Sequence, residues 1–230
     1  MQNIDFQIFN KSKIPILKEA LSDLAFLINK NYSLNASLKL VGDRYELVDR
    51  QRAAIMRCVS TIQYQNNTSQ KELLVSDLQG KDVAIDGFNL LIVLECAYNK
   101  LPIFKGLDKC IRDIASVHGT YKSIQETNFS IELIGEKLSQ LEVSSVEWVL
   151  DSPIAHSGSL RHKIEQISKR NAWRWSVILH KNPDQYLSEL TEKVIISSDS
   201  LIIEKSKHWC NLSVYLIENF IKEAWIIDLS

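Results

Sequence analysis

Residues 82–90 read DVAIDGFNL, a short apolar run that ends in Asp86 and passes through a glycine into a second apolar stretch. This order is typical of a buried strand that turns directly into a helix. Residues 146–150 (VEWVL) form a second such run, and Asp151 follows it at once. The sequence therefore predicts two buried strands that each lead into an aspartate.

Two further apolar runs, residues 175–179 and 194–197, extend the predicted sheet, and Asp199 lies two residues beyond the second of them. A last run, residues 225–227, is followed by Asp228. Strands that alternate with helices predict an α/β fold with a doubly wound, mainly parallel sheet. The expected helices cover residues 90–98, 107–141 (a long pair), 160–169 and 186–192.

In open α/β sheets, ligands bind beyond the carboxyl ends of the strands. Neighbouring parallel strands lie about 4.8 Å apart, so we expect Asp86, Asp151 and Asp199 within reach of one divalent cation. Without a counterion, carboxylates this close raise one another's pKa values. Hard oxygen ligands without His or Cys favour Mg²⁺ or Mn²⁺ over Zn²⁺. The alternative for each aspartate is a turn or a helix cap, in which this residue is also favoured.

The composition is that of an ordinary globular protein, since 45% of the 230 residues are hydrophobic and 24% are charged. No apolar stretch approaches the roughly 20 residues that span a bilayer, and the N-terminal MQNIDFQIFN lacks the order of a signal peptide. We therefore expect a cytoplasmic protein without a membrane partner. The four cysteines stand far apart without zinc-site spacing, and we expect them to be reduced.

The chain is expected to divide into a small helical module, residues 1–70, and an α/β domain, residues 71–230. The join is placed in the stretch 63–70 (QYQNNTSQ), which is polar and has no apolar periodicity.

Within the module, apolar residues at helical spacing predict one helix over residues 16–28 and a second after Val48, connected by a link over residues 37–45. This second helix gives the module a basic edge. We interpret that edge as a packing surface or a homodimer surface, with nucleic-acid contact as the alternative. The residues that form it are Arg50, Arg52 and Arg57.

With 27 basic and 28 acidic residues, the net charge of −1 predicts no global attraction to nucleic acid, so any contact must be local. One candidate patch begins at residue 161, and Glu165 is its single acid up to residue 181. Ser157 belongs to a candidate phosphate-holding turn ahead of it. The alternatives are a solvated helix face and a plain capping loop. The candidate nucleic-acid ligands are Ser157, Arg161, Lys163, Lys169, Arg170 and Arg174.

Four short motifs resemble the NYN branch of the PIN-like nuclease superfamily. Residues 85–90 (IDGFNL) are similar to its opening strand, aspartate, glycine and asparagine. Residues 194–200 (VIISSDS) are similar to its later strand, serine and aspartate motif. VLDSP at 149–153 and PDQYLSEL at 183–190 stand where the family has two further acids.

The resemblance implies a metal-dependent phosphodiester hydrolase with a PIN-like fold, usually a ribonuclease for single-stranded or structured RNA, with Mg²⁺ or Mn²⁺ as cofactor. Asn89 would bind a ligand water or a phosphate from a helix N-terminus. Glu126 would face the site from a helix, and its alternative is an exposed helix charge. The implied catalytic residues are Asp86, Asp151, Asp199, Asn89 and Glu126. The implied metal ligands are Asp86, Asp151, Asp199 and Asp184.

One departure from the superfamily pattern concerns the number of metal ions. PIN domains often have a second aspartate close to the one after the fourth strand. Here Asp199 is followed by Ser200 and three apolar residues before Glu204. One and two bound ions are therefore both left open.

Most of the chain also resembles an uncharacterised two-part bacterial and archaeal family, domain of unknown function 434 fused to domain of unknown function 5616. The stretches that carry this resemblance are LKLVGDRYELVDRQR, IDGFN and RDIASVHGTY, which is followed by ET. This resemblance supports the division into two parts and adds little chemistry.

Other functions compete with the nuclease. The glycines form neither a Walker loop nor a dinucleotide fingerprint, and Phe88 stands where a phosphatase with an aspartyl nucleophile needs its second acid. His118 and His156 are expected to be structural. The main alternative is a catalytically weak PIN-like module that binds RNA or a protein. A third hypothesis is a hydrolase that acts on a small phosphorylated molecule.

Overall fold

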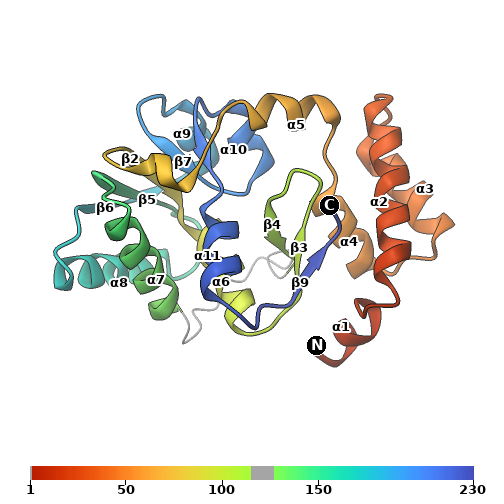
Figure 1. Ribbon diagram of the computed structural model, residues 1–230, viewed down its shortest axis with the longest axis horizontal. Coiled ribbons are helices and arrows are strands. Elements are labelled where there is room, and N and C mark those ends of the chain that lie inside the picture. The colour runs from red at the N-terminus through yellow and green to blue at the C-terminus, as the bar shows by residue number, and fades with distance from the viewer. Residues whose placement is uncertain (1, 115–126) are drawn as a thin grey trace.

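Six parallel strands form the main sheet, in the order β1-β8-β7-β2-β5-β6 (Figure 1). The computed structural model describes residues 2–114 and 127–230. Along the chain, the sheet grows from β2 through β5 to β6 and then returns to the other side of β2 with β7 and β8. The strand order therefore reverses beside β2. The strands are β1 (Glu72–Leu73), β2 (Asp82–Asp86), β5 (Ser145–Asp151), β6 (Trp175–His180), β7 (Val194–Ile196) and β8 (Trp209–Cys210).

Helices cover both faces of this sheet, and alternate strand residues point to opposite faces. Ile85 and Trp148 belong to the larger core, whereas Ala84 and Val149 belong to a smaller core on the other face. The larger core includes residues of α6 (Gly87–Tyr98), α7 (Thr127–Gln140), α8 (Ser157–Arg170) and α11 (Leu212–Phe220). The smaller core includes residues of α9 (Pro183–Glu189) and α10 (Ser200–Lys205).

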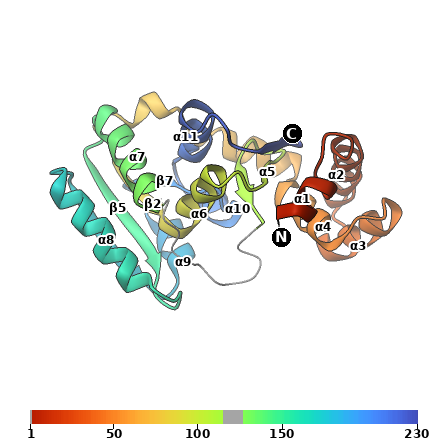
Figure 2. The ribbon, with the colours of Figure 1, turned by 90° about the horizontal axis from the view of Figure 1, so that it is seen from below.

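A second sheet connects the α/β part to the N-terminal helices, of which Figures 1 and 2 show α1 to α4 at one end of the molecule. Its strand order is β4-β3-β9, with β3 (Ile103–Lys105) between β4 (Ile111–Asp113) and β9 (Ile226–Asp228). Phe104 of β3 meets Phe9 of the helical part with ring centroids 4.8 Å apart. The helices are α1 (Gln2–Ile8), α2 (Ile14–Asn29), α3 (Leu34–Arg44), α4 (Asp49–Cys58) and α5 (Ile62–Ser69), and the short 3₁₀ helix η1 (Val75–Leu78) follows β1.

The predicted α/β fold, with a parallel sheet and an N-terminal helical part, is confirmed. The strands expected at residues 82–85, 146–150, 175–179 and 194–197 are all present in the main sheet. The run at 225–227 instead enters the second sheet, because its partner is β3.

Two local expectations are wrong. The helix pair expected over residues 107–141 begins with a turn and with β4, which pairs antiparallel with β3, and only α7 is helical in the described part of this range. The link expected over 37–45 lies almost entirely in α3, in which Val41 is the one apolar side chain among the buried positions, so the segment shows no apolar pattern. The polar stretch 63–70, where the join was placed, lies largely in α5, in which only Thr68 is buried.

None of the helices within residues 2–114 and 127–230 combines the length and the apolar character needed to cross a membrane.

Candidate active site

The carboxyl ends of β7, β2 and β5 meet at one edge of the main sheet, where the strand order reverses. Asp86 is the last residue of β2 and pairs with Val149 of β5, while the preceding Ile85 pairs with Ile196 of β7. Asp199 follows three residues after Ile196, as the N-cap of α10. Ligands of doubly wound sheets bind at this point of strand reversal.

Four aspartates gather on the α9 and α10 side of this edge. Asp86 and Asp151 point to the same face as Ala84 and Val149, because strand side chains alternate. Asp184 lies in the first turn of α9, and Asp199 begins α10. Asp151 stands two residues beyond the partner of Asp86, which places it about 7 Å further along the strand direction.

Asp86 is the most perturbed of these four groups. Burial raises the pKa of Asp86 from 3.8 to about 7, and the charges of Asp199 and Asp184 act in the same direction. The Ser197 hydroxyl opposes this rise by donating a hydrogen bond of 2.8 Å to Oδ2 of Asp86. An aspartate that ionises near neutral pH is typical of functional sites, and a cation would favour its charged form.

Asp184 and Asp151 form the outer part of the cluster. Burial, and then the charges of Asp199 and Asp151, raise the pKa of Asp184, while Lys205 lowers it. Burial alone raises the pKa of Asp151. The Oδ1 atom of Asp151 is buried and has no hydrogen-bond partner among the described residues. A buried carboxylate oxygen without a partner is unfavourable, so this atom is suited to an added ligand.

Hydrogen bonds hold the loop from Ser197 to Asp199 in place. Asn89 Oδ1, in the first turn of α6, accepts hydrogen bonds from the Ser198 backbone N–H at 2.9 Å and from the Ser198 hydroxyl at 2.8 Å. The Asp199 N–H donates to Ser197 Oγ at 3.0 Å. The carboxamide oxygen of Asn89 thus orients this loop, and the predicted role of Asn89 in binding a ligand water or a phosphate stays a prediction.

Asp199 also caps α10, as the alternative reading of a strand-end aspartate predicts. Its Oδ1 accepts hydrogen bonds from the backbone N–H groups of Leu201, at 2.8 Å, and Ile202, at 3.4 Å. Capping occupies this one oxygen of the carboxylate. The capping role and a ligand role are therefore compatible for Asp199.

No three His, Cys, Asp or Glu side chains in the described parts of the chain lie close enough to bind one metal ion as they stand. The charges of Asp199 and Asp184 act on Asp86, and those of Asp199 and Asp151 act on Asp184, but the four carboxylates do not form a ready coordination sphere. Their chemistry nevertheless fits a hard divalent cation, because all donors are carboxylate oxygens and Asp151 Oδ1 lacks a partner. The carboxylate oxygens would have to move closer together to bind one ion.

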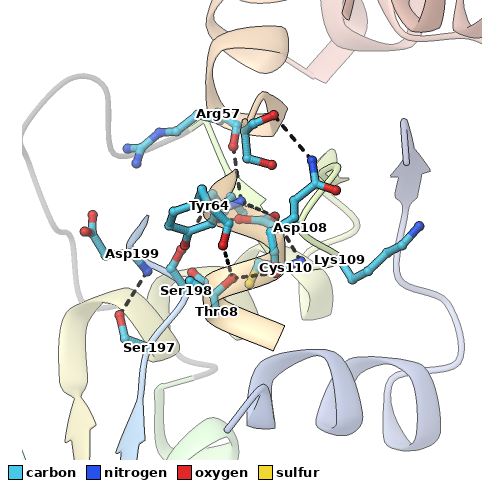
Figure 3. A network of polar contacts seen from close by, with 12 residues as sticks. Arg57, Tyr64, Thr68, Asp108, Lys109, Cys110, Ser197, Ser198 and Asp199 are labelled. Carbon is cyan, nitrogen blue, oxygen red and sulfur yellow. Dashed lines mark hydrogen bonds and ion pairs between the residues drawn. The ribbon is translucent and has the colours of Figure 1, made fainter. Parts of the chain in front are cut away.

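An ion pair that the sequence analysis missed lies beneath this loop. The Arg112 Nη2 atom lies 2.6 Å from Asp108 Oδ2, and the Arg112 Nε donates to the Ser198 carbonyl oxygen at 2.8 Å. Figure 3 shows Asp108 beside Tyr64, Ser198 and Cys110. The sequence analysis did not identify the pair, because it assigned this segment to a helix.

The predicted nucleic-acid residues are distributed along the whole of α8. Ser157 is buried at the start of α8, with its hydroxyl 3.3 Å from the Ser152 carbonyl oxygen, and Arg161 pairs with Glu165 at 2.8 Å. Lys169 and Arg170 are in the last turn of α8, roughly 20 Å from its first residue. Arg174 immediately precedes β6 and lies at the amino edge of the sheet, opposite the carboxyl edge that carries the aspartates.

One cavity adjoins this helix. It lies between α7 and α8, has a volume of about 440 Å³ and is lined mainly by polar residues, among them Asn128, Ser159, Lys163 and Arg170. Arg170 forms an ion pair with Glu132 of α7. Lys163 has no ion-pair partner within residues 2–114 and 127–230 and is free to meet an anion.

Several other candidates have defined positions. Glu126 and His118 lie outside the described residues. His156 is the N-cap of α8 in a left-handed conformation, with φ of 68°. In the helical module, Arg50 donates from Nε and Nη2 to the two carboxylate oxygens of Asp5 at 2.7 and 2.9 Å. The module therefore uses this arginine of its predicted basic edge internally.

The fold and site define an α/β protein with an acidic cluster at the switch point of a doubly wound sheet. The chain belongs to the family described as Domain of unknown function (DUF5616), whose model matches residues 75–215. A second model, Protein of unknown function (DUF434), matches residues 16–71, which shows the two-part architecture. An uncharacterised protein of Methanocaldococcus jannaschii is 31% identical over 204 residues, which cover 88% of this chain and 97% of that protein. No solved structure matches.

Proposed function

We propose that this protein is a metal-dependent phosphodiester hydrolase of the PIN-like kind, with RNA as its substrate. The observation that carries the proposal is the position of Asp86, which is partly buried at the strand-reversal point and whose pKa is raised by burial and by the charges of Asp199 and Asp184. Such a group of acids is unfavourable without a counterion. The motifs that resemble PIN-like nucleases supply the same aspartates in the same order along the chain.

The residues have distinct parts in the proposed site. Asp86, Asp199 and Asp184 would hold a Mg²⁺ or Mn²⁺ ion, and Asp151 would contribute its unpartnered Oδ1 to the same ion or to a second one. When bound, such an ion lowers the pKa of a coordinated water and neutralises charge on phosphoryl oxygens. Ser197 orients the Asp86 carboxylate, and Asn89 fixes the loop that carries Asp199.

The cavity between α7 and α8 supports an RNA substrate. Both helices begin at the carboxyl edge of the sheet, because each precedes or follows β5 as a crossover. Lys163 supplies an unpaired positive charge about 9 Å along α8 from Ser157. In this proposal, the phosphate backbone crosses the carboxyl edge of the sheet, from the acidic cluster on the α9 and α10 side to the cavity between α7 and α8 on the other side. The basic residues near the end of α8 contribute less.

One observation favours a second candidate, a PIN-like module that binds RNA or a protein without efficient cleavage. The aspartates within the described residues do not already form a coordination sphere. A protein of this kind would bind its partner equally well with and without divalent ions, and substitutions in the acidic cluster would leave the affinity unchanged.

Cleavage of an end-labelled single-stranded RNA with Mn²⁺ or Mg²⁺ separates the two candidates. The first predicts cleavage that requires the metal and falls about 100-fold or more in Asp86→Asn and in Asp199→Asn. Asp82→Asn, at the exposed start of the same strand β2, is the control for loss of a carboxylate. Wild-type protein that binds RNA without cleaving it, or variants that cleave it normally, would contradict the nuclease.

A further inference from the structure

The guanidinium group of Arg112 joins three separate parts of the chain. Its Nε donates to the carbonyl oxygen of Ser198, directly before Asp199, at 2.8 Å. Its Nη1 donates to the carbonyl oxygen of Arg57, at the end of α4, at 3.2 Å. Its Nη1 and Nη2 donate to the two oxygens of Asp108 at 2.9 and 2.6 Å. One side chain thus connects the helical module, the turn before β4 and the site loop.

This arrangement needs arginine and its buried partner together. The side chains of Arg112 and Asp108 are only 9% and 5% exposed, so each charge would be costly to bury alone. The planar guanidinium directs its donors in several fixed directions, whereas a lysine ammonium is a single point of charge. Lysine at this position would keep the charge but lose part of the connection.

The helical module contacts the site region at further points. The Leu107 N–H donates to the Cys58 carbonyl oxygen at 2.9 Å, and a Cβ atom on Gly106 would meet that oxygen at 2.9 Å. A side chain at position 106 is therefore excluded by backbone atoms of α4. Lys71, just after α5, donates to the carbonyl oxygen of Glu204 in α10 at 2.7 Å.

Tyr64 of α5 brings the helical module close to the site loop. Figure 3 shows it beside Ser198, near Asp199. Its hydroxyl is buried without a hydrogen-bond partner among the described residues, and burial followed by the charge of Asp108 raises its pKa. The module therefore packs against the reverse side of the loop that carries Asp199.

We propose that Arg112 is a positioning residue that fixes the Ser197–Asp199 loop to the helical module, so that the module forms part of the catalytic unit. The inference rests on the proposed function for its effect on activity. Its structural part, the coupling of the module to the loop through Arg112, can be tested without any activity.

Amide hydrogen exchange of Arg112→Lys tests the coupling. We expect amides of residues 197–202, which include the Asp199 N–H and the capped Leu201 N–H, to exchange about tenfold faster or more than in the wild type. Arg50→Lys is a matched control, because Arg50 also forms a two-pronged pair with an aspartate but within the module alone. In Arg50→Lys, faster exchange should stay within residues 2–58. Unchanged exchange at residues 197–202 in Arg112→Lys would overturn the proposal.

RNA cleavage by the same variants tests the functional part. Arg112→Lys is expected to lower kcat on the order of tenfold to 100-fold with little change in KM, since a small displacement of a site group has effects of this size. Arg50→Lys should retain the wild-type kcat. An equal loss in both variants would mean that Arg112 acts through general stability only, and would overturn the proposal.

If Arg112→Lys does not fold, Asp108→Asn replaces it, because asparagine keeps a neutral hydrogen-bond acceptor beside Arg112. Asp108→Asn should then show the same faster exchange at residues 197–202, and unchanged exchange there would contradict the coupling. If the wild type cleaves no RNA while the exchange pattern is as expected, the coupling stands and the proposed nuclease function alone is wrong.

Discussion

Replacing Asp86 with asparagine is expected to stabilise the metal-free protein, and increasingly so as the pH rises. In the folded state burial raises the pKa of Asp86 to about 7, whereas the ordinary value is 3.8. Below pH 3.8 Asp86 is protonated in both the folded and the unfolded protein, so its carboxyl group does not lower the stability of the fold. Between pH 3.8 and about 7 Asp86 is ionised in the unfolded chain but still protonated in the folded one, so the free energy of unfolding falls as the pH rises and levels off above the folded pKa.

The size of this loss follows from the two pKa values. Each pH unit between them is worth about 1.4 kcal/mol, so Asp86 costs at most about 4 kcal/mol above pH 7. The residue is only partly enclosed, and solvent screening lowers this ceiling. Asparagine has no such titration, and its oxygen can still accept the hydrogen bond from Ser197. The advantage of Asp86→Asn should therefore grow by up to about 3 kcal/mol between pH 5 and pH 8.

Urea denaturation at pH 5 and pH 8 in buffer with EDTA measures this difference, with Asp82→Asn as the control variant. Adding Mn²⁺ should then stabilise the wild type more than Asp86→Asn, by about 2.7 kcal/mol when the ion is present at 100 times its dissociation constant. Parallel pH profiles for the wild type and Asp86→Asn would refute the reasoning, because Asp86 would then ionise normally in the folded protein.

Two further predictions concern the support of the site and the substrate path. A Cβ atom on Gly87 would lie 2.4 Å from Leu150 Cδ2 and 3.1 Å from the Val149 carbonyl oxygen, so Gly87→Ala is expected to lower the free energy of unfolding by about 1–3 kcal/mol. Gly158→Ala, which meets nothing within 4 Å, should be neutral or stabilising in the same urea titration, and equal effects would contradict the close approach of α6 to β5. Lys163→Gln should lower the slope of log affinity against log salt for single-stranded RNA in EDTA by about 0.7, whereas an unchanged slope would show that no phosphate lies in the cavity between α7 and α8.

The strands at the site could be predicted from the sequence because each is a short, mainly apolar run. β2, β5 and β7 are covered by helices on both sides, so most of their side chains are buried, and Glu147 of β5 is the one polar residue between the ends of these strands. Aspartate directly after such a run then falls at the carboxyl edge of the sheet. Convergence of Asp86 and Asp199 needed only this local pattern and the parallel arrangement.

The support of the site could not be predicted in this way. β4 has three residues and pairs with β3 across a short turn, so it has neither the length nor the periodicity of a recognisable strand. Asp108 and Arg112 are four positions apart, a spacing that usually indicates an ion pair on a helix surface. Their burial depends on the helical module, which comes from a distant part of the chain, and no local pattern contains that information.

The offset of Asp151 also has a physical origin in pairing register. Asp86 pairs with Val149, so the strand β5 continues for two residues after β2 has ended. The sequence placed both aspartates at strand ends but contained no measure of how far each strand extends. The pairing register therefore places Asp151 apart from Asp86 and Asp199. This favours a site in which Asp151 acts through its charge on Asp184 or binds a second ion.

The energetic position of Asp86 is the strongest reason to look for a ligand that the chain itself does not supply. A cost of up to about 4 kcal/mol is a large part of the 5–15 kcal/mol by which domains are usually stable. Within the described residues, the Ser197 hydroxyl is the one side-chain donor whose bond to this carboxylate opposes the rise in pKa. A single hydrogen bond to a charged group contributes about 1.5–3 kcal/mol.

The buried guanidinium group of Arg112 contacts the site loop, but it donates its hydrogen bonds to Asp108 and to carbonyl oxygens. The cost of up to about 4 kcal/mol already includes the Ser197 hydrogen bond. A divalent cation at the strand ends would offset this cost and would bind Asp184 and Asp199 at the same time. Titration of the wild type with Mn²⁺ should accordingly lower the pH at which Asp86 ionises, and a pKa that does not move on metal addition would leave the acidic cluster without this explanation.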